Sequence, residues 1–349
     1  MLKRIVAAVF GCLMLVAFTS CSLFEGLGAS SVGESDVSSE PVDINYPLDM
    51  DGVYIEKMPE RVVSLSPALT EMVSELGYGS RLVGRTDYCD YPAAVASLPA
   101  VGSPMMLDTA KIAELKPDLI LMQVPPTNEA LVAMQQTGAA IVTLQKGYDL
   151  NSTAELYAKI FKIMEGAEAG ATKGEEYKTQ FLNRINALTQ AVQSTVSAQS
   201  DAPDYTAAYI IDTASIAATP DTYEGKLLTV LGLKNVTEDG ANWNYPMEGL
   251  ADAKPYVLLC GSGIDIESFS SGKNFKGLSA VKDGRVYKVE SVIFERQTPR
   301  LADELERLAK EIYPDITIGG APEALQPGTS GEDVSSEASS AQESSSTQA

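Results

Sequence analysis

The sequence predicts an α/β protein with two lobes, each a mainly parallel sheet flanked by helices, bridged by one long rigid helix. Strands and helices alternate on both sides of the stretch 171–197, and no proline interrupts the chain between Pro126 and Pro203. Within that stretch the large apolar residues recur at steps of three and four, which places them on one helix face: Tyr177, Phe181, Ile185, Leu188, Val192 and Val196. Such a helix would be roughly 40 Å long, more than one ordinary domain needs. We therefore expect a strut between two lobes; a single overlong helix across one domain is the alternative.

The chain begins with a predicted secretory signal, residues 1–20. Two basic residues, Lys3 and Arg4, precede an apolar run at 5–18 that is short for a membrane span. The small residues before Cys21 resemble the bacterial lipobox, although Phe18 stands where leucine is usual. Lipid on Cys21 would anchor the protein at the outer face of the cytoplasmic membrane. An ordinary signal peptide is the alternative.

Composition separates the ends of the chain from its globular part. Residues 21–43 are rich in Ser, Gly and Glu without periodicity, so they predict a flexible tether, and 319–349 predict a disordered Ser/Glu-rich tail. Between them we expect an N-terminal lobe at 44–168, the bridging helix at 169–200 and a C-terminal lobe with its closing helix at 201–318.

Charge and residue usage exclude several functions. The formal net charge of −21 argues against binding nucleic acid, because such binding depends on neutralising phosphates. The chain has no histidine, which removes Ser-His and Cys-His nucleophile pairs and the commonest zinc ligand. We identify no catalytic residues, no metal site and no resident cofactor, and expect a protein that is not an enzyme. Cys89 and Cys260 stand one in each half; free thiols are expected, with a bridge as the alternative.

The first half alternates strands and helices in order. β-branched runs predict strands at 61–65, 82–84, 118–124 and 140–144. Between and after them, periodic apolar stretches predict helices at 68–76, 108–115, 128–136 and 152–164. Ser66 followed by Pro67 is a typical helix start.

The second half repeats this style. It predicts strands at 206–211, 256–260 and 286–289, and helices at 223–231 and 299–312. One phrase recurs in both halves: a helix end, a Lys-Pro break and a buried strand, at 112–121 and again at 250–259. The repetition supports two related lobes.

Ligands of open parallel sheets bind beyond the carboxyl ends of the strands, so residues just after the strands are the candidates for a cleft between the lobes. An aromatic-rich cleft with one positive group suits a bulky, flat or partly anionic small molecule. The candidate ligand-binding residues are Ser66, Tyr88, Tyr91, Met105, Met106, Trp243, Tyr245, Phe294 and Arg296.

Several segments resemble the cobalamin- and iron-siderophore-binding proteins of bacterial ABC importers. They cover the chain in order from about Arg61 to Pro314: 61–71, 83–88, 115–120, 283–287 and 294–300. The last, Phe-Glu-Arg-Gln-Thr-Pro-Arg, is similar to the vitamin B12-binding branch. The resemblance implies a class III-type solute-binding protein, a monomer with limited hinge motion that delivers a small-molecule metal chelate to an ABC permease dimer with its ATPase.

The resemblance also implies permease docking through one glutamate on each lobe, for which Glu71 and Glu248 are the matching positions. Such rim charges set orientation and encounter rate. The chain departs from the cobalamin branch at Val292 and Ile293, where an acidic residue and a tryptophan are usual, and in the region 104–106. Cobalamin, another corrinoid and a ferric siderophore therefore stay open, whereas haem and free Mn²⁺ or Zn²⁺ are disfavoured without histidine. An enzyme or a ligand-free adhesion or scaffold protein on the same fold is the alternative function.

Overall fold

The structure is a computed structural model that describes residues 45–213 and 216–319, all within one compact unit, Asp43–Ala349. The predicted signal peptide, the whole of the predicted tether with Cys21, and the tail beyond residue 319 lie outside the described residues. The predicted domain boundaries at those ends therefore stay predictions.

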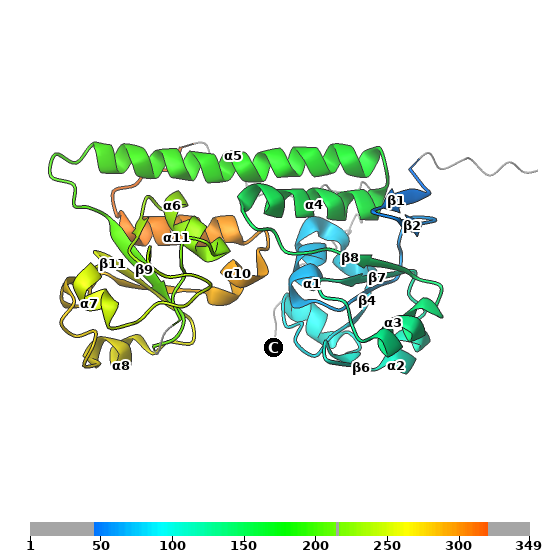
Figure 1. The fold of residues 1–349 in the computed structure, drawn as a ribbon. Helices are drawn as coiled ribbons and strands as arrows, with labels where there is room; N and C mark the ends of the chain where they lie inside the picture. Colours follow the sequence, from blue (N-terminus) through cyan, green and yellow to red (C-terminus); the bar gives the residue numbers. More distant parts are fainter. Residues whose placement is uncertain (1–44, 214–215, 320–349) are drawn as a thin grey trace, which may run out of the picture. The chain divides into compact units, whose positions relative to one another are not determined.

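Two four-stranded parallel sheets form the centres of two lobes (Figure 1). In the N-lobe the strand order is β4 (Leu82–Arg85), β3 (Val62–Ser64), β7 (Leu119–Met122) and β8 (Ala140–Thr143). In the C-lobe it is β10 (Lys234–Asn235), β9 (Thr206–Ile210), β11 (Val257–Gly261) and β12 (Val286–Val289). All ladders within both sheets are parallel, and the central strands β7 and β11 are buried at every position, as both-face coverage requires.

Helices cover the sheet of the N-lobe at nearly the predicted positions. They are α1 (Pro67–Val73), α2 (Thr109–Glu114), α3 (Asn128–Gln135) and α4 (Leu150–Glu165). The Oγ of Ser66 accepts from the backbone N–H of Leu69, and Pro67 opens α1, so the predicted helix start is confirmed. Asp149 and Ser152 form a reciprocal capping box at the start of α4.

The C-lobe is less regular than the N-lobe. Its helices are α6 (Tyr223–Val230), α7 (Gly249–Ala253), α8 (Ile266–Ser271), α9 (Ser279–Lys282), α10 (Ser291–Arg296) and α11 (Leu301–Ile312). The predicted helices near α6 and α11 are confirmed, as is the helix end predicted before the second Lys-Pro break, which is α7. The helices α8 to α10 were not predicted because elements of four to six residues carry too little periodicity. The antiparallel pairs β1 (Leu48–Met50) with β2 (Val53–Ile55) and β5 (Gly102–Ser103) with β6 (Met106–Leu107) were missed for the same reason.

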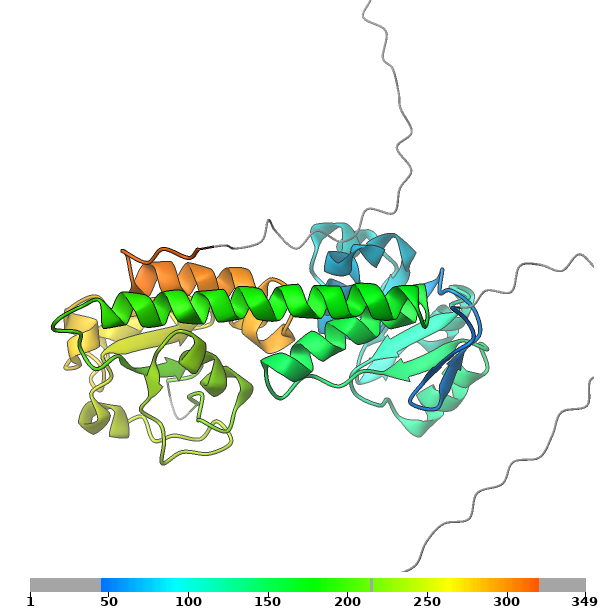
Figure 2. The same ribbon diagram turned by 90° about the horizontal axis from the view of Figure 1, so that it is seen from above.

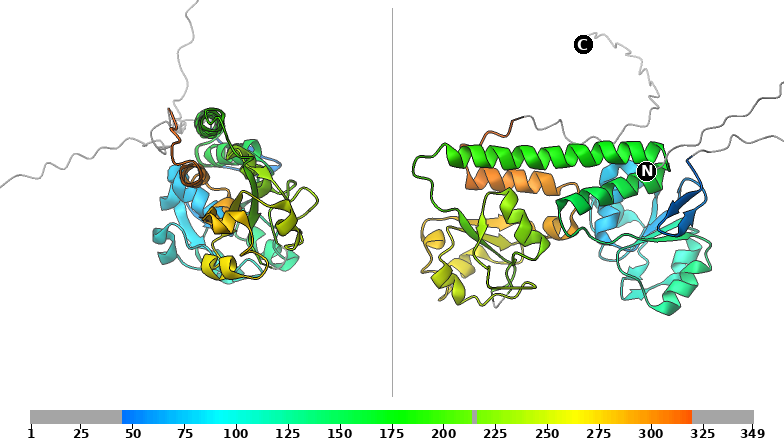
Figure 3. Two further views of the ribbon diagram at one scale, coloured as in Figure 1. Left: turned by 90° about the vertical axis from the view of Figure 1, so that its left-hand side faces the viewer. Right: turned by 45° about the horizontal axis from the view of Figure 1, so that its top comes forward.

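The predicted strut is α5, Ala169–Ser197, which packs on α4 of the N-lobe and on α6 and α11 of the C-lobe (Figures 1 and 2). Figure 3 shows α11 lying beneath α5 along the C-lobe half of its length. Five residues of the predicted apolar stripe are buried: Tyr177, Phe181, Ile185, Leu188 and Val192. The sixth, Val196, is half-buried and packs against the core. The bridge between the lobes is thus a continuous helix whose stripe completes the core.

Two glycines let α4 and α5 approach closely. A Cβ added at Gly170 would lie 2.4 Å from the backbone oxygen of Phe161, and one at Gly174 would lie 2.8 Å from that of Ala158. Only glycine fits where one backbone approaches another so tightly. Because α4 belongs to the N-lobe, these contacts fix the direction in which α5 leaves it.

Both cysteines among the described residues are free and buried, Cys89 in the N-lobe and Cys260 in β11, which confirms the expected free thiols. Within the described ranges, no helix combines the length and apolar character that a membrane span requires. α5 has the length but not the composition, because its outward face is polar.

Candidate ligand-binding site

Three of the hollows in the described structure lie at the carboxyl ends of the two sheets. The inter-lobe hollow has a volume of about 440 Å³ and takes its lining from both lobes: Pro67, Ala68, Asp87, Tyr88, Asp90, Gln123, Lys146, Val292, Glu295 and Arg296. The N-lobe hollow, about 550 Å³, lies beyond β3 and β7: Leu65, Ser66, Pro67, Pro104, Met105, Gln123, Val124, Pro125, Pro126 and Thr127. The two hollows share Pro67 and Gln123 and so adjoin each other.

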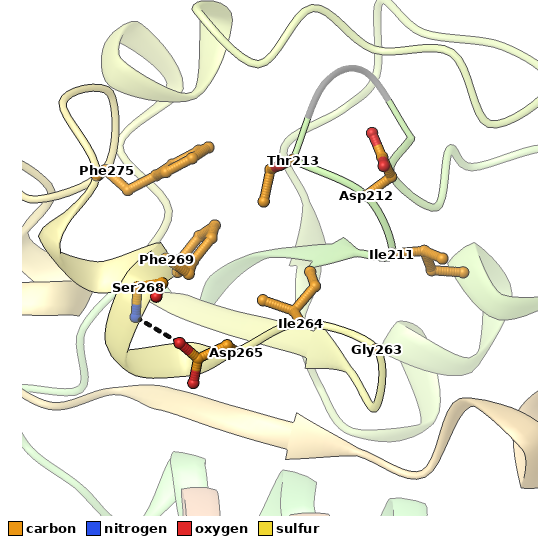
Figure 4. A pocket seen from close by; sticks show the side chains of 10 residues that line it. Ile211, Asp212, Thr213, Gly263, Ile264, Asp265, Ser268, Phe269 and Phe275 are labelled. Atoms are coloured by element: carbon orange, nitrogen blue, oxygen red, sulfur yellow. Dashed lines mark hydrogen bonds between the residues drawn. The ribbon is translucent and has the colours of Figure 1, made fainter.

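A third hollow, the C-lobe hollow, lies beyond the carboxyl ends of β9 and β11 and has a volume of about 410 Å³. Figure 4 shows Phe269 and Phe275 on one side of it and Ile211 and Asp212 on the other. The two phenylalanine rings stack with centroids 4.1 Å apart. Asp265 accepts from the backbone N–H of Ser268 at 3.1 Å and caps α8. Hydrogen bonding from the Ser268 side chain, and then from its backbone, lowers the pKa of the Asp265 carboxyl.

The junction of the inter-lobe and N-lobe hollows carries a polar pair. The Oγ of Ser66 donates to Oε1 of Gln123 at 2.7 Å. The Nε2 of Gln123 is buried and has no hydrogen-bond partner among the described residues. A buried donor without a partner costs free energy, so a ligand that supplies an acceptor at this point would gain a bond that nothing in the described protein makes.

Apolar surface surrounds this polar pair. Met105 is 90% exposed and Val124 76%, although both are large apolar side chains. Tyr88, 62% exposed, stands on the inter-lobe side. Exposed apolar side chains gathered around a hollow are typical of a binding site for a large ligand with apolar faces.

Of the nine residues predicted to contact the ligand, the structure brings four to the two adjoining hollows: Ser66, Tyr88, Met105 and Arg296. Met106 lies in β6 with a side chain that is 79% exposed, outside the lining of the three hollows described above. Tyr91 lies under the guanidinium of Arg300, whose Cζ is 3.6 Å from its ring centroid. Trp243 is half-buried, packs edge-on to Tyr209 with centroids 6.4 Å apart, and accepts from Ala217 N–H through its carbonyl.

Two predicted contacts need correction. Phe294 is fully buried and packs against Tyr209, with ring centroids 5.8 Å apart, and Tyr245 is 7% exposed in the core of the C-lobe. Both side chains lie in the interior of the C-lobe, where a large aromatic ring is stabilised by the apolar area that it buries. Neither side chain lines one of the three hollows in this conformation.

Sequence reasoning missed five polar or charged residues that line the inter-lobe hollow: Asp87, Asp90, Gln123, Lys146 and Glu295. Gln123 follows β7 directly and Lys146 follows β8 closely, just as Ser66 follows β3. Gln123 was missed because the predicted strand at 118–124 includes it, whereas β7 ends at Met122. Lys146 lies two residues after the predicted strand at 140–144, where the rule that selected Ser66 applies.

Glu71 lies at the contact between the lobes. Its side chain is fully buried, and its carboxylate accepts from the guanidinium of Arg300 at 2.7 Å and from that of Arg296 at 3.3 Å, with a further bond from the Thr298 hydroxyl. Arg296 also forms an ion pair with Asp90 at 2.7 Å. Two acidic residues of the N-lobe thus hold two arginines of the C-lobe; we call Glu71, Asp90, Arg296 and Arg300 the inter-lobe clamp.

This position corrects the expectation for Glu71. Docking to a permease requires an exposed carboxylate, and here the carboxylate of Glu71 already pairs with arginines of its own chain. Glu248 is exposed at the start of α7, as docking requires.

A second set of bonds joins the lobes beside the clamp. The side-chain amide of Gln297 makes two hydrogen bonds to the backbone of Gly147: its Nε2 donates to the Gly147 carbonyl at 2.9 Å, and its Oε1 accepts from the Gly147 N–H at 2.8 Å. The backbone carbonyl of Gln297 accepts from the hydroxyl of Tyr157 at 2.7 Å. Hydrogen bonds from the N-lobe therefore hold the segment 296–300 in place. The backbone of Gln297 is left-handed, with a φ of 55°.

Comparisons with known proteins agree with this architecture. A family model described as periplasmic binding protein matches residues 62–292. The uncharacterised ABC transporter substrate-binding lipoprotein YvrC of Bacillus subtilis is 30% identical over 79% of this chain and 86% of its own length. The vitamin B12-binding protein of Vibrio vulnificus strain YJ016 is 24% identical over 72% of this chain and 89% of its own.

Solved structures share the fold. A possible iron-binding periplasmic solute-binding protein from Staphylococcus epidermidis superposes with a TM-score of 0.61 at 23% identity, covering 74% of this chain and all of that one. The periplasmic vitamin B12-binding protein of Vibrio cholerae superposes with a TM-score of 0.55 at 23% identity, covering 73% and 96%. The expected class of fold, two parallel-sheet lobes and one long helix, is confirmed.

Proposed function

This chain belongs to the periplasmic binding protein family, and from that premise we propose that it is the lipid-anchored, extracytoplasmic receptor of an ABC importer. It captures a metal chelate of the corrinoid or ferric-siderophore kind between its lobes and delivers it to the permease. The names of its relatives, a substrate-binding lipoprotein and a vitamin B12-binding protein, support this assignment. The assignment is to binding and not to catalysis.

One observation carries the proposal: an inter-lobe hollow lined by both lobes adjoins an apolar hollow, and Gln123 offers an unpartnered donor where they meet. A site of this kind can enclose a large ligand that has apolar faces and polar edges. Lipidation at Cys21 and the monomeric state remain part of the proposal, since they concern residues and partners outside the described structure.

A binding screen tests the proposal, with absorbance and calorimetric titration of the purified protein against cyanocobalamin, cobinamide, ferric siderophores and haem. We expect at least one chelate to bind saturably, and we expect that chelate to remain chemically unchanged on prolonged incubation with the protein. For the chelate that binds, Gln123→Leu is expected to weaken affinity by up to about tenfold, because a hydrogen bond contributes about 0.5–1.5 kcal/mol. Gln180→Leu, an exposed change on α5, should leave affinity unchanged. Binding of no chelate, or turnover of one, would contradict the proposal.

Docking is proposed to involve Glu248 on the C-lobe. Glu248→Lys should place a positive charge opposite the arginines expected on the permease, where misplaced like charges oppose association by several kcal/mol. We expect stimulation of the transporter's ATPase to fall steeply while the ligand affinity of the isolated receptor is retained. Glu176→Lys makes the same charge change on the exposed face of α5 and should leave stimulation intact. Equal stimulation by the two variants would remove Glu248 from the docking surface.

A further inference from the structure

The inter-lobe hollow, to which both lobes contribute, has an acidic lining; together with the adjoining N-lobe hollow we call it the cleft. The inter-lobe hollow is lined by three carboxylates and two cations: Asp87, Asp90, Glu295, Lys146 and Arg296. Among the described residues, the lining of the N-lobe hollow carries no charge, and that of the C-lobe hollow includes Asp212 and Asp265. A ligand in the cleft therefore meets more negative than positive charge.

One of the two cations of the inter-lobe hollow, Arg296, already pairs with carboxylates of the protein. Arg296 is held by Glu71 and Asp90, and its hydrogen bond holds the pKa of the Asp90 carboxyl below its usual value. Lys146 forms no ion pair among the described residues, although its charge opposes the rise that burial causes in the pKa of the Glu224 carboxyl. An anionic ligand would have to compete with Glu71 and Asp90 for Arg296, and would lose its hydration in doing so. Lys146 itself is one positive charge against Asp87 and Glu295 in the same lining.

The remaining recognition groups are neutral. The Nε2 of Gln123 is a buried donor without a described partner, and it adjoins the apolar surface of Met105 and Val124. An amide-type donor of this kind pairs with carbonyl-like oxygens, such as those of carboxamide or hydroxamate groups.

We propose that this cleft selects neutral or cationic metal chelates that carry amide-type oxygens, and rejects polyanionic chelates. The inference rests on the proposed function and specifies the substrate class of the same site. Its physical basis is that like charges brought together across a partly desolvated surface repel, whereas a neutral chelate meets the apolar lining and the Gln123 donor without that penalty.

The test compares chelates of different charge on the purified protein at low and moderate salt. Cyanocobalamin (neutral, with carboxamides) and ferrioxamine B (cationic, with hydroxamates) represent the two sources of the proposed chemistry. Haem, with its propionates, and a ferric tricatecholate represent anionic chelates. We expect one of the first pair to bind roughly tenfold or more tightly than either anionic chelate, with the difference shrinking as salt screens it.

A double variant tests which residues set the preference. Asp87→Asn combined with Glu295→Gln removes two exposed lining charges. The ratio of affinities should shift toward the anionic chelates, and cationic ferrioxamine B should lose affinity relative to them. A folding defect would weaken every chelate alike, so it cannot produce this ratio. Glu56→Gln combined with Glu176→Gln removes the same net charge at exposed positions of β2's end and α5 and should leave the ratio unchanged.

The outcomes separate this inference from the proposed function. If no chelate of either kind binds, the proposed function fails. If a haem or tricatecholate binds as tightly as the best neutral or cationic chelate, the receptor function stands and the charge selection is overturned. The same conclusion follows if the lining variant and its control shift the affinity ratio equally.

Discussion

Replacing Glu71 with alanine is expected to lower the free energy of unfolding by about 3–5 kcal/mol, the cost of leaving buried partners of an ion pair uncompensated. Its carboxylate is fully buried and receives bonds from three residues of the C-lobe segment 296–300. Without it Arg296 and Arg300 lose the carboxylate that pairs with both of them, and Arg296 keeps only its ion pair with Asp90 among the described residues. Equilibrium denaturation followed by circular dichroism measures the loss.

The same variant should also loosen the lobes. Spin labels at Val132→Cys in α3 and Lys282→Cys in α9, both exposed, report the distance between N-lobe and C-lobe. We expect the distance distribution to broaden in Glu71→Ala.

Glu304 supplies a matched control. It is 4% exposed and forms an ion pair with the more exposed Arg307 at 2.7 Å, but both residues belong to α11. Glu304→Ala should therefore lower stability by a similar mechanism without broadening the inter-lobe distance. Wild-type stability in Glu71→Ala would show that its carboxylate is not confined in the clamp, and would return Glu71 to the docking surface.

The case of Glu71 shows why this part of the site could not be predicted. On its own helix the residue has the appearance of an ordinary solvated glutamate, and the arginines that bind it lie 225 and 229 positions later in the chain. Contacts over such separations depend on how the lobes meet, which no local pattern encodes. The resemblance to the family supplied a role for the charge but not its partners.

The elements themselves were predictable because their causes are local. The apolar steps of α5 and the buried runs of β7 and β11 follow from periodicity within a single segment. Phe294 and Tyr245 were misplaced because residue type alone cannot say whether an aromatic ring faces the interior or the cleft. Gln123 was missed because the predicted strand ran to residue 124, whereas β7 ends at Met122 and leaves Gln123 at the carboxyl edge of the sheet.

Replacing Phe181 with alanine is expected to lower the free energy of unfolding by about 3–5 kcal/mol, as truncation of a buried aromatic ring does when the surroundings cannot collapse. Phe181 is fully buried in α5, and its ring meets that of Tyr157 in α4 edge-on, with centroids 5.2 Å apart. The Gly170 and Gly174 contacts with α4 limit how far the two helices can shift to fill the cavity. Chemical denaturation measures the effect, and Leu182→Ala, a half-buried neighbour, should cost clearly less.

This variant should also weaken ligand affinity. Tyr157 donates to the backbone carbonyl of Gln297 and so helps to hold the segment that carries Arg296 of the inter-lobe hollow. Phe181→Ala removes the ring behind Tyr157, whereas Tyr157→Phe keeps the ring and removes only the hydroxyl bond, worth about 0.5–1.5 kcal/mol. Both should weaken chelate affinity, but only Phe181→Ala should lower stability strongly. If Phe181→Ala costs no more than Leu182→Ala, the α4–α5 contact does not support the clamp; the strut would then connect the lobes without holding their contact surface in place.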